Sequence, residues 1–114
     1  TIADSISVDM PRDGVRALRA ARETDGAYLT VSDDEILAAI PELGKTGIFA
    51  EPAGAAAFAG LEKIVREEKI DVDDPILVLI TGNGLKDIRA ALQSVKKAPV
   101  IEPTMAALKK HLKI

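Results

Sequence analysis

Apolar and polar residues follow two kinds of pattern along the chain, and the two patterns alternate. Three short runs are mostly apolar and bounded by turn-forming residues: 27–31 (AYLTV), 47–51 (GIFAE) and 76–80 (ILVLI). Runs of this length without a regular polar face are typical of strands that are buried on both sides of a parallel sheet. We therefore expect three strands in these ranges.

Between and around these runs, apolar residues recur at helical spacing. The predicted helices cover residues 13–26, 32–40, 52–69, 85–95 and 104–113. Ser32 and Glu35 have the spacing of a capping box, and Pro52 and Thr104 are residues favoured at helix starts. Pro41 is expected to kink or end its helix, because proline removes a backbone donor and clashes with the preceding turn.

Strands and helices that alternate three times predict an α/β fold of three layers, in which helices cover short parallel strands. Three strands make a small sheet, and a parallel sheet needs its faces and edges covered. The chain also starts at Thr1, without methionine and without a signal sequence. We therefore expect residues 1–114 to be part of a larger domain, present here as a fragment.

Composition narrows the classes of protein. Hydrophobic residues make up 47% of the chain and charged residues 29%, which is a globular balance. The net charge is −3 with both signs mixed along the chain, so no basic stripe for nucleic acid or an anionic membrane is present. No apolar run approaches the roughly 20 residues of a membrane span. The chain has no cysteine, so we expect a cytoplasmic protein without a nucleic-acid or membrane partner.

Two strand ends carry the candidate chemistry, residues 51–57 (EPAGAAA) and 81–87 (TGNGLKD). Ligands of open parallel sheets bind beyond the carboxyl ends of the strands. Either segment also has an ordinary interpretation, as a closely packed helix start or as a turn that needs glycine. The glycines do not match a phosphate-binding loop. The remaining candidate is the Thr81 hydroxyl, which can hydrogen-bond one heteroatom of a flat ligand. Glu51 would be a second polar contact, beside a surface of small alanine side chains.

Other polar residues have weaker cases. Asp71, Asp73 and Asp74 lack the pattern of a cation loop and are expected in a solvated turn, so no metal site is predicted. His111 has no carboxylate or second imidazole nearby in sequence, and Lys86 begins an exposed helix, so both are expected at the surface.

Four segments together resemble the carboxyl-terminal third of the threonine synthase family: TIADSISVDMPRDG, SDDEIL, GIFAEPAGAAAFAGL and TGNGLKD. This family belongs to the tryptophan-synthase-β-like pyridoxal-phosphate enzymes of fold type II, and the resemblance covers essentially the whole chain. TGNGLKD is its most specific segment. The resemblance implies the large domain of such an enzyme and the conversion of O-phosphohomoserine and water to threonine and phosphate.

The resemblance also implies roles for single residues toward pyridoxal phosphate. Thr81 matches the hydroxyl residue that hydrogen-bonds the pyridine nitrogen, and Gly82 lets the backbone pass close to the ring edge. Ala3, in the TIAD segment, is implied near the cofactor, and Glu51 is the polar contact that the strand end itself suggests. A neutral hydroxyl at the nitrogen does not enforce protonation as an aspartate would, so it moderates the ring as an electron sink.

The chain also departs from the family. The Schiff-base lysine and the phosphate loop of the family lie upstream of the segments found here, so we expect no catalytic residue in this chain and no activity without the missing amino-terminal part. Two alternatives stay open: a non-catalytic module that associates with itself or with a parent enzyme, and a fragment of a related threonine or serine dehydratase. Alanine-rich surfaces left bare would favour self-association.

Overall fold

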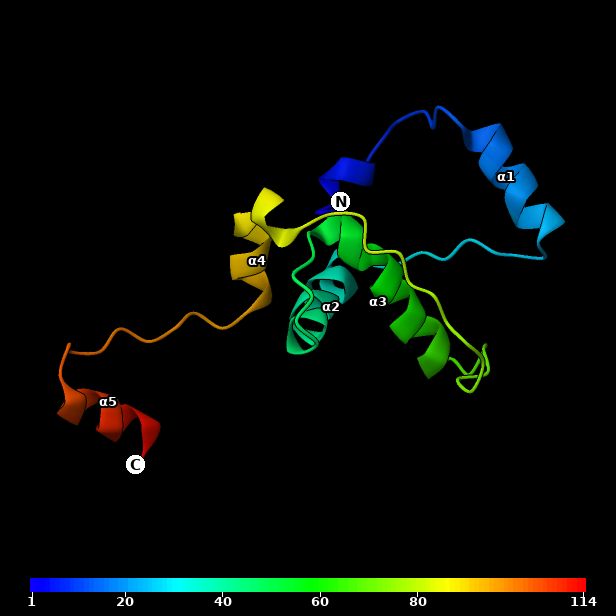
Figure 1. Cartoon of the computed structure of the whole chain (residues 1–114). Helices are drawn as coiled ribbons and strands as arrows, with labels where there is room; N and C mark the ends of the chain where they lie inside the picture. The colour runs from blue at the N-terminus through cyan, green and yellow to red at the C-terminus, as the bar shows by residue number, and fades with distance from the viewer.

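Two helices form the centre of the computed structural model, which describes residues 1–114 (Figure 1). They are α2 (Asp33–Lys45) and α3 (Pro52–Arg66), and they pack against each other. Their facing residues include Ile36, Ile40 and Ala55, each at most 4% exposed. The core of the molecule therefore lies between α2 and α3.

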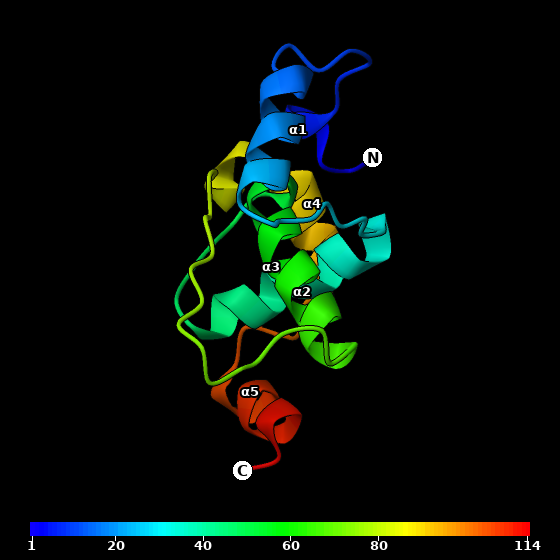
Figure 2. The same cartoon turned by 90° about the vertical axis from the view of Figure 1, so that its right-hand side faces the viewer.

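The remaining helices are shorter and lie around this pair. They are η1 (Asp4–Ile6), α1 (Gly14–Glu23), η2 (Gly84–Lys86), α4 (Ile88–Ser94) and α5 (Met105–Leu112). The turn η1 packs against α3, and α4, whose Ala90 is buried, packs against α2. Helices α1 and α5 bury no residue and lie at opposite ends of the molecule (Figures 1 and 2).

The local signals for helix starts are confirmed. The Ser32 hydroxyl accepts a hydrogen bond from the Glu35 N–H at 3.2 Å, and the Glu35 carboxylate accepts one from the Ser32 N–H at 2.8 Å. Pro52 occupies the first turn of α3. The Thr104 hydroxyl accepts from the Ala107 N–H at 3.1 Å and begins α5. Side chains close in sequence set these three boundaries.

Two helix boundaries were predicted wrongly. Helix α2 continues through Pro41 to Lys45; Leu43, beyond the proline, is 4% exposed in the core, and its burial offsets the lost backbone hydrogen bond. The predicted helix 85–95 is divided into η2 and α4. The division lies at Asp87, whose carboxylate accepts from the Ala90 N–H at 2.9 Å and so starts a new helix.

The predicted parallel sheet is not present in this structure. Residues 27–31 and 76–80 are irregular, and no strand is formed. A single antiparallel bridge joins Ala50 to Asn83; beside it the Glu51 N–H donates to the Gly82 carbonyl at 3.1 Å. A strand requires a hydrogen-bonded neighbour, and residues 27–31 and 76–80 have none within the chain. The sequence pattern identified apolar runs but not the partners that would make them strands.

The buried core is small for the length of the chain. Only 14 of 114 residues are buried, and the radius of gyration is 18.3 Å, against about 13 Å to 14 Å for a compact domain of this size. Large apolar side chains such as Leu77 (86% exposed) lie open to solvent. No helix is both long and apolar enough to cross a membrane. The fold therefore presents an unusually large apolar surface.

The start of α2 makes stability depend on pH. Hydrogen bonds from the Ser32 N–H and hydroxyl lower the pKa of Glu35 below its usual 4.5, and those from the Thr1 hydroxyl and the Ile2 N–H lower the pKa of Asp33 below its usual 3.8. Carboxyls with lowered pKa values stabilise the fold above their usual pKa, and this contribution is lost as pH falls through the lowered values.

We therefore expect the thermal midpoint, followed by circular dichroism, to hold from pH 7 to about pH 5. Below that it should fall toward pH 2. The variant Glu35→Gln should show a smaller fall, because it removes one of the two carboxyls at this helix start whose pKa is lowered. A midpoint that rises as pH drops below 4 would contradict this account of the helix start.

Candidate functional site

Three segments that are distant in sequence meet at the Glu51 carboxylate. They are the turn η1, the start of α3 and the loop 81–87. The Ser5 hydroxyl donates to Oε2 of Glu51 at 3.4 Å, and Nζ of Lys86 donates to Oε1 at 3.2 Å. Glu51 is only 5% exposed, whereas the Lys86 side chain is 62% exposed. The buried carboxylate therefore connects three parts of the chain.

Glycines allow the start of α3 and the loop 81–87 to pack in direct contact. A Cβ at Gly54 would lie 3.0 Å from the Gly82 carbonyl oxygen and 3.1 Å from its nitrogen. A Cβ at Gly82 would lie 1.6 Å from Oε1 of Glu51. The two segments that the sequence singles out, 51–57 and 81–87, thus touch through backbone that carries no side chain.

Thr81 stands at the beginning of this packed loop. Its side chain is exposed, and its hydroxyl makes no hydrogen bond within the chain. The next residue, Gly82, is fixed by its contacts with Gly54 and Glu51 and by its carbonyl bond to the Glu51 N–H. The chain therefore presents a free neutral hydroxyl on a fixed backbone, and such a group fits one polar atom of a ligand.

The other predicted site residues lie behind this surface. Ala3 is 1% exposed and belongs to the core around α2 and α3. The Glu51 carboxylate is occupied by Ser5 and Lys86. The structure thus brings Ala3, Glu51 and Gly82 to one end of α3, with Thr81 at the surface.

Sequence reasoning missed the polar partners of Glu51. Lys86, expected to be solvated, forms an ion pair with it, and Ser5 had no assigned role. These contacts span 35 and 46 residues, so no local pattern could reveal them. A small polar cavity of about 120 Å³ adjoins the pair. Its lining comprises Ile2, Asp4, Ser5, Glu51, Pro52, Ala53, Lys86 and Asp87.

The remaining polar candidates lie away from this site. Asp71, Asp73 and Asp74 are exposed in a turn, where the Asp71 carboxylate accepts from the Asp73 N–H at 3.0 Å. His111 is exposed on α5. These positions agree with the surface roles that the sequence predicts.

Comparison with known proteins gives these segments a context. The family described as pyridoxal-phosphate dependent enzyme matches residues 1–82. The chain is 41% identical over 114 residues to threonine synthase from Methanocaldococcus jannaschii, covering 99% of this chain and 28% of that protein. It is 39% identical over 104 residues to threonine synthase from Halalkalibacterium halodurans, covering 90% of this chain and 29% of that protein.

The chain thus spans less than a third of the length of the curated relatives it matches, and the matched region is their carboxyl-terminal portion. The family match includes the turn η1 and the start of α3, which meet at Glu51, and it ends at Gly82 within the loop 81–87. On this evidence, the chain belongs to the pyridoxal-phosphate-dependent enzyme family.

Proposed function

We propose that this chain is the carboxyl-terminal portion of a threonine synthase. The complete enzyme would convert O-phosphohomoserine and water to threonine and phosphate with pyridoxal phosphate. The observation that carries the proposal is the 41% identity to a threonine synthase over 99% of the chain. The free Thr81 hydroxyl on its fixed loop supports it, because one polar atom of a flat cofactor needs such a contact.

Thr81 would hold the pyridine nitrogen of the cofactor, and Gly82 would let the backbone lie close to the ring edge. Pyridoxal phosphate, when bound, supplies an electron sink for bonds at the substrate. A threonine hydroxyl leaves the nitrogen free of a negative partner, so it moderates that sink. Ala3 would pack beneath the site, and Glu51 would hold Gly82 in its position.

The remainder of the active site would come from the amino-terminal part of the complete enzyme. A covalent role for a lysine requires a free amine in a desolvated site. No lysine of this chain matches the family's Schiff-base lysine, and Lys86 is paired with Glu51. We therefore expect the isolated chain to be inactive. In the complete enzyme, segments 27–31, 47–51 and 76–80 would be strands of one parallel sheet between helices.

A chimera tests this function. The part of the Methanocaldococcus jannaschii threonine synthase that precedes the matched region would be joined to residues 1–114. We expect the purified chimera, supplied with pyridoxal phosphate, to release phosphate from O-phosphohomoserine, whereas the isolated chain releases none. A folded chimera that instead releases ammonia from threonine or serine would identify a dehydratase and overturn the proposal.

In this chimera, Thr81→Val should lower kcat about threefold to tenfold, because it removes one hydrogen bond worth about 0.5–1.5 kcal/mol. Thr81→Ser keeps the hydroxyl and should retain most of the activity. Both variants should unfold at the same urea concentration as the parent, because the Thr81 side chain is exposed and unbonded. Full activity of Thr81→Val would remove Thr81 from the site.

A second function, self-association without catalysis, is favoured by the exposed apolar surface. Leu77, Leu79 and Tyr28 are each at least 65% exposed, and such surfaces tend to associate. Light scattering with size-exclusion chromatography of the isolated chain separates the two cases. A stable homodimer whose contacts cover these residues, together with an inactive chimera, would favour the module over the enzyme.

A further inference from the structure

The loop 81–87 contains the only asparagine of the chain, Asn83, and a glycine follows it. The Gly84 nitrogen can attack the side-chain amide carbon of Asn83 and close a five-membered ring, because no Cβ at residue 84 hinders the attack. Asn83 is exposed to solvent. A larger residue at position 84 would slow this reaction, but a Cβ there would overlap the Phe49 ring. The packing of the loop therefore requires the very residue that makes Asn83 reactive.

Two backbone hydrogen bonds hold Asn83 in a conformation that cannot react. The Gly84 N–H donates to the Phe49 carbonyl at 2.9 Å. On the other side of Asn83, the Gly82 carbonyl accepts from the Glu51 N–H at 3.1 Å. The ring would place the Gly84 nitrogen beside Cβ of Asn83, which in an L-residue requires a negative ψ, whereas Asn83 has a ψ of 142°. Ring closure therefore requires the hydrogen bond to Phe49 to break.

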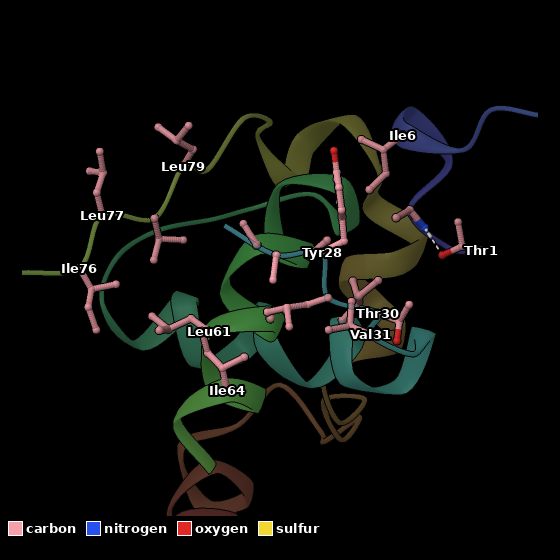
Figure 3. A pocket seen from close by; sticks show the side chains of 18 residues that line it. Thr1, Ile6, Tyr28, Thr30, Val31, Leu61, Ile64, Ile76, Leu77 and Leu79 are labelled. Carbon is pink, nitrogen blue, oxygen red and sulfur yellow. Dashed lines mark hydrogen bonds between the residues drawn. The ribbon is translucent and has the colours of Figure 1, made fainter. Parts of the chain in front are cut away.

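The segment that leads into the loop allows the loop to open. Residues 76–80 make no backbone–backbone hydrogen bond, and residues 76–79 line an open apolar cavity of about 740 Å³ beside α3 (Figure 3). Leu77 in this segment is 86% exposed. Segments with few buried contacts and few backbone bonds open locally, without unfolding of the whole chain. The loop therefore depends on its own contacts with α3 and residues 49–51 to stay closed.

We propose that Asn83 is a deamidation site that is protected while the loop 81–87 packs against residues 49–51. When the loop opens, a bond forms between the Gly84 nitrogen and Cγ of Asn83, and the bond from Cγ to Nδ2 breaks. The side-chain nitrogen leaves as ammonia and takes the proton of the Gly84 N–H. Water then opens the ring at one of its two carbonyl carbons, which gives either aspartate or isoaspartate at position 83.

The reaction would prevent the loop from closing again. Isoaspartate adds one carbon to the main chain, so the hydrogen bonds on the two sides of residue 83 can no longer form together. Either product also adds a negative charge at a residue bridged to Ala50, next to the buried Glu51. In the proposed enzyme the modified loop would no longer place the Thr81 hydroxyl, and this consequence alone rests on the proposed function.

Ageing of the isolated chain in mildly alkaline buffer tests the proposal. Mass spectrometry of the intact chain follows the conversion of an amide to an acid, for which the chain offers only Asn83 and the much less reactive Gln93. We expect the conversion to be at least about tenfold slower in the folded chain than in concentrated urea. Gly82→Ala disturbs the packing of the loop and should speed the conversion in the folded chain, whereas Gly44→Ala should not.

Asp13 and Gly14 provide a reference for the chemistry itself. This pair forms the same ring by loss of water, and the Gly14 N–H makes no backbone hydrogen bond. Peptide mapping should therefore show a smaller difference between the folded chain and urea at Asp13 than at Asn83.

The outcomes do not depend on the proposed function. Equal rates at Asn83 in the folded chain and in urea would overturn the protection by the loop, and no conversion in urea would overturn the site itself. A folded Gly82→Ala chain that converts as slowly as the parent would also overturn the role of the loop. Should Gly82→Ala fail to fold, the parent chain with and without urea decides the proposal.

Discussion

Replacing Gly82 with alanine is expected to lower the free energy of unfolding of the chain by about 1–3 kcal/mol. The new Cβ would lie 1.6 Å from Oε1 and 2.4 Å from Cδ of Glu51. The carboxylate has little room to move away, because Glu51 is 5% exposed and bonded to Ser5 and Lys86. On the other side of Gly82, the backbone of α3 at Gly54 blocks a shift of the loop. The substitution therefore either breaks the ion pair or separates the loop from α3.

Urea denaturation followed by circular dichroism measures this effect, and Gly44→Ala is the matched control. Gly44 lies inside α2, and a Cβ there would meet nothing within 4 Å. Alanine at such a position should stabilise the helix by up to about 1 kcal/mol. The two substitutions add the same methyl group with opposite expected signs. Equal effects at the two sites would show that the contact between Glu51 and Gly82 carries no energy.

The sequence predicted features that depend on neighbouring residues. The capping box of Ser32 and Glu35 and the starts of α3 and α5 were recognisable because each depends on side chains within four positions. The path of α2 through Pro41 was not, because the burial of Leu43 against other elements decides it. Local propensity sets a helix boundary only where tertiary packing does not oppose it.

The apolar runs show the same limit. The composition of 76–80 predicts a buried strand, yet Leu77 is 86% exposed. Burial requires partners, and residues 76–79 face α3 and residues 27–31 across an open apolar cavity of about 740 Å³. Strand pairing is a property of two segments, so a pattern within one segment cannot establish it.

The candidate site was predictable in part for a related reason. Glycines that recur in 51–57 and 81–87 indicated close backbone approach, and the structure shows that these segments approach each other. A glycine shows that a close contact is possible, but it does not identify the residue on the other side of that contact. The pairing of Glu51 with Lys86 links residues 35 positions apart, and only the folded chain brings them together.

The second large expected effect is that replacing Lys86 and replacing Glu51, the two members of the buried ion pair, should change the free energy of unfolding by different amounts. Lys86→Met should lower the free energy of unfolding by about 1–3 kcal/mol, because it leaves the buried Glu51 carboxylate without its close cationic partner. Only the Ser5 hydroxyl, at 3.4 Å, would remain. Glu51→Gln should cost less, about 0.5–1.5 kcal/mol, because the amide still accepts a hydrogen bond. The Lys86 ammonium, 62% exposed, would also stay hydrated.

An exposed ion pair in the same chain provides the control. Nζ of Lys45 lies 2.7 Å from the Glu42 carboxylate, and their side chains are 71% and 45% exposed. Lys45→Met should therefore change the free energy of unfolding by only about 0–1 kcal/mol. The two lysine substitutions remove the same charge, so a larger loss at Lys86 isolates the cost of the buried carboxylate. Equal losses of stability at Lys45 and Lys86 would mean that the Glu51 carboxylate is hydrated. In that case the glycine packing alone would fix the loop that carries Thr81.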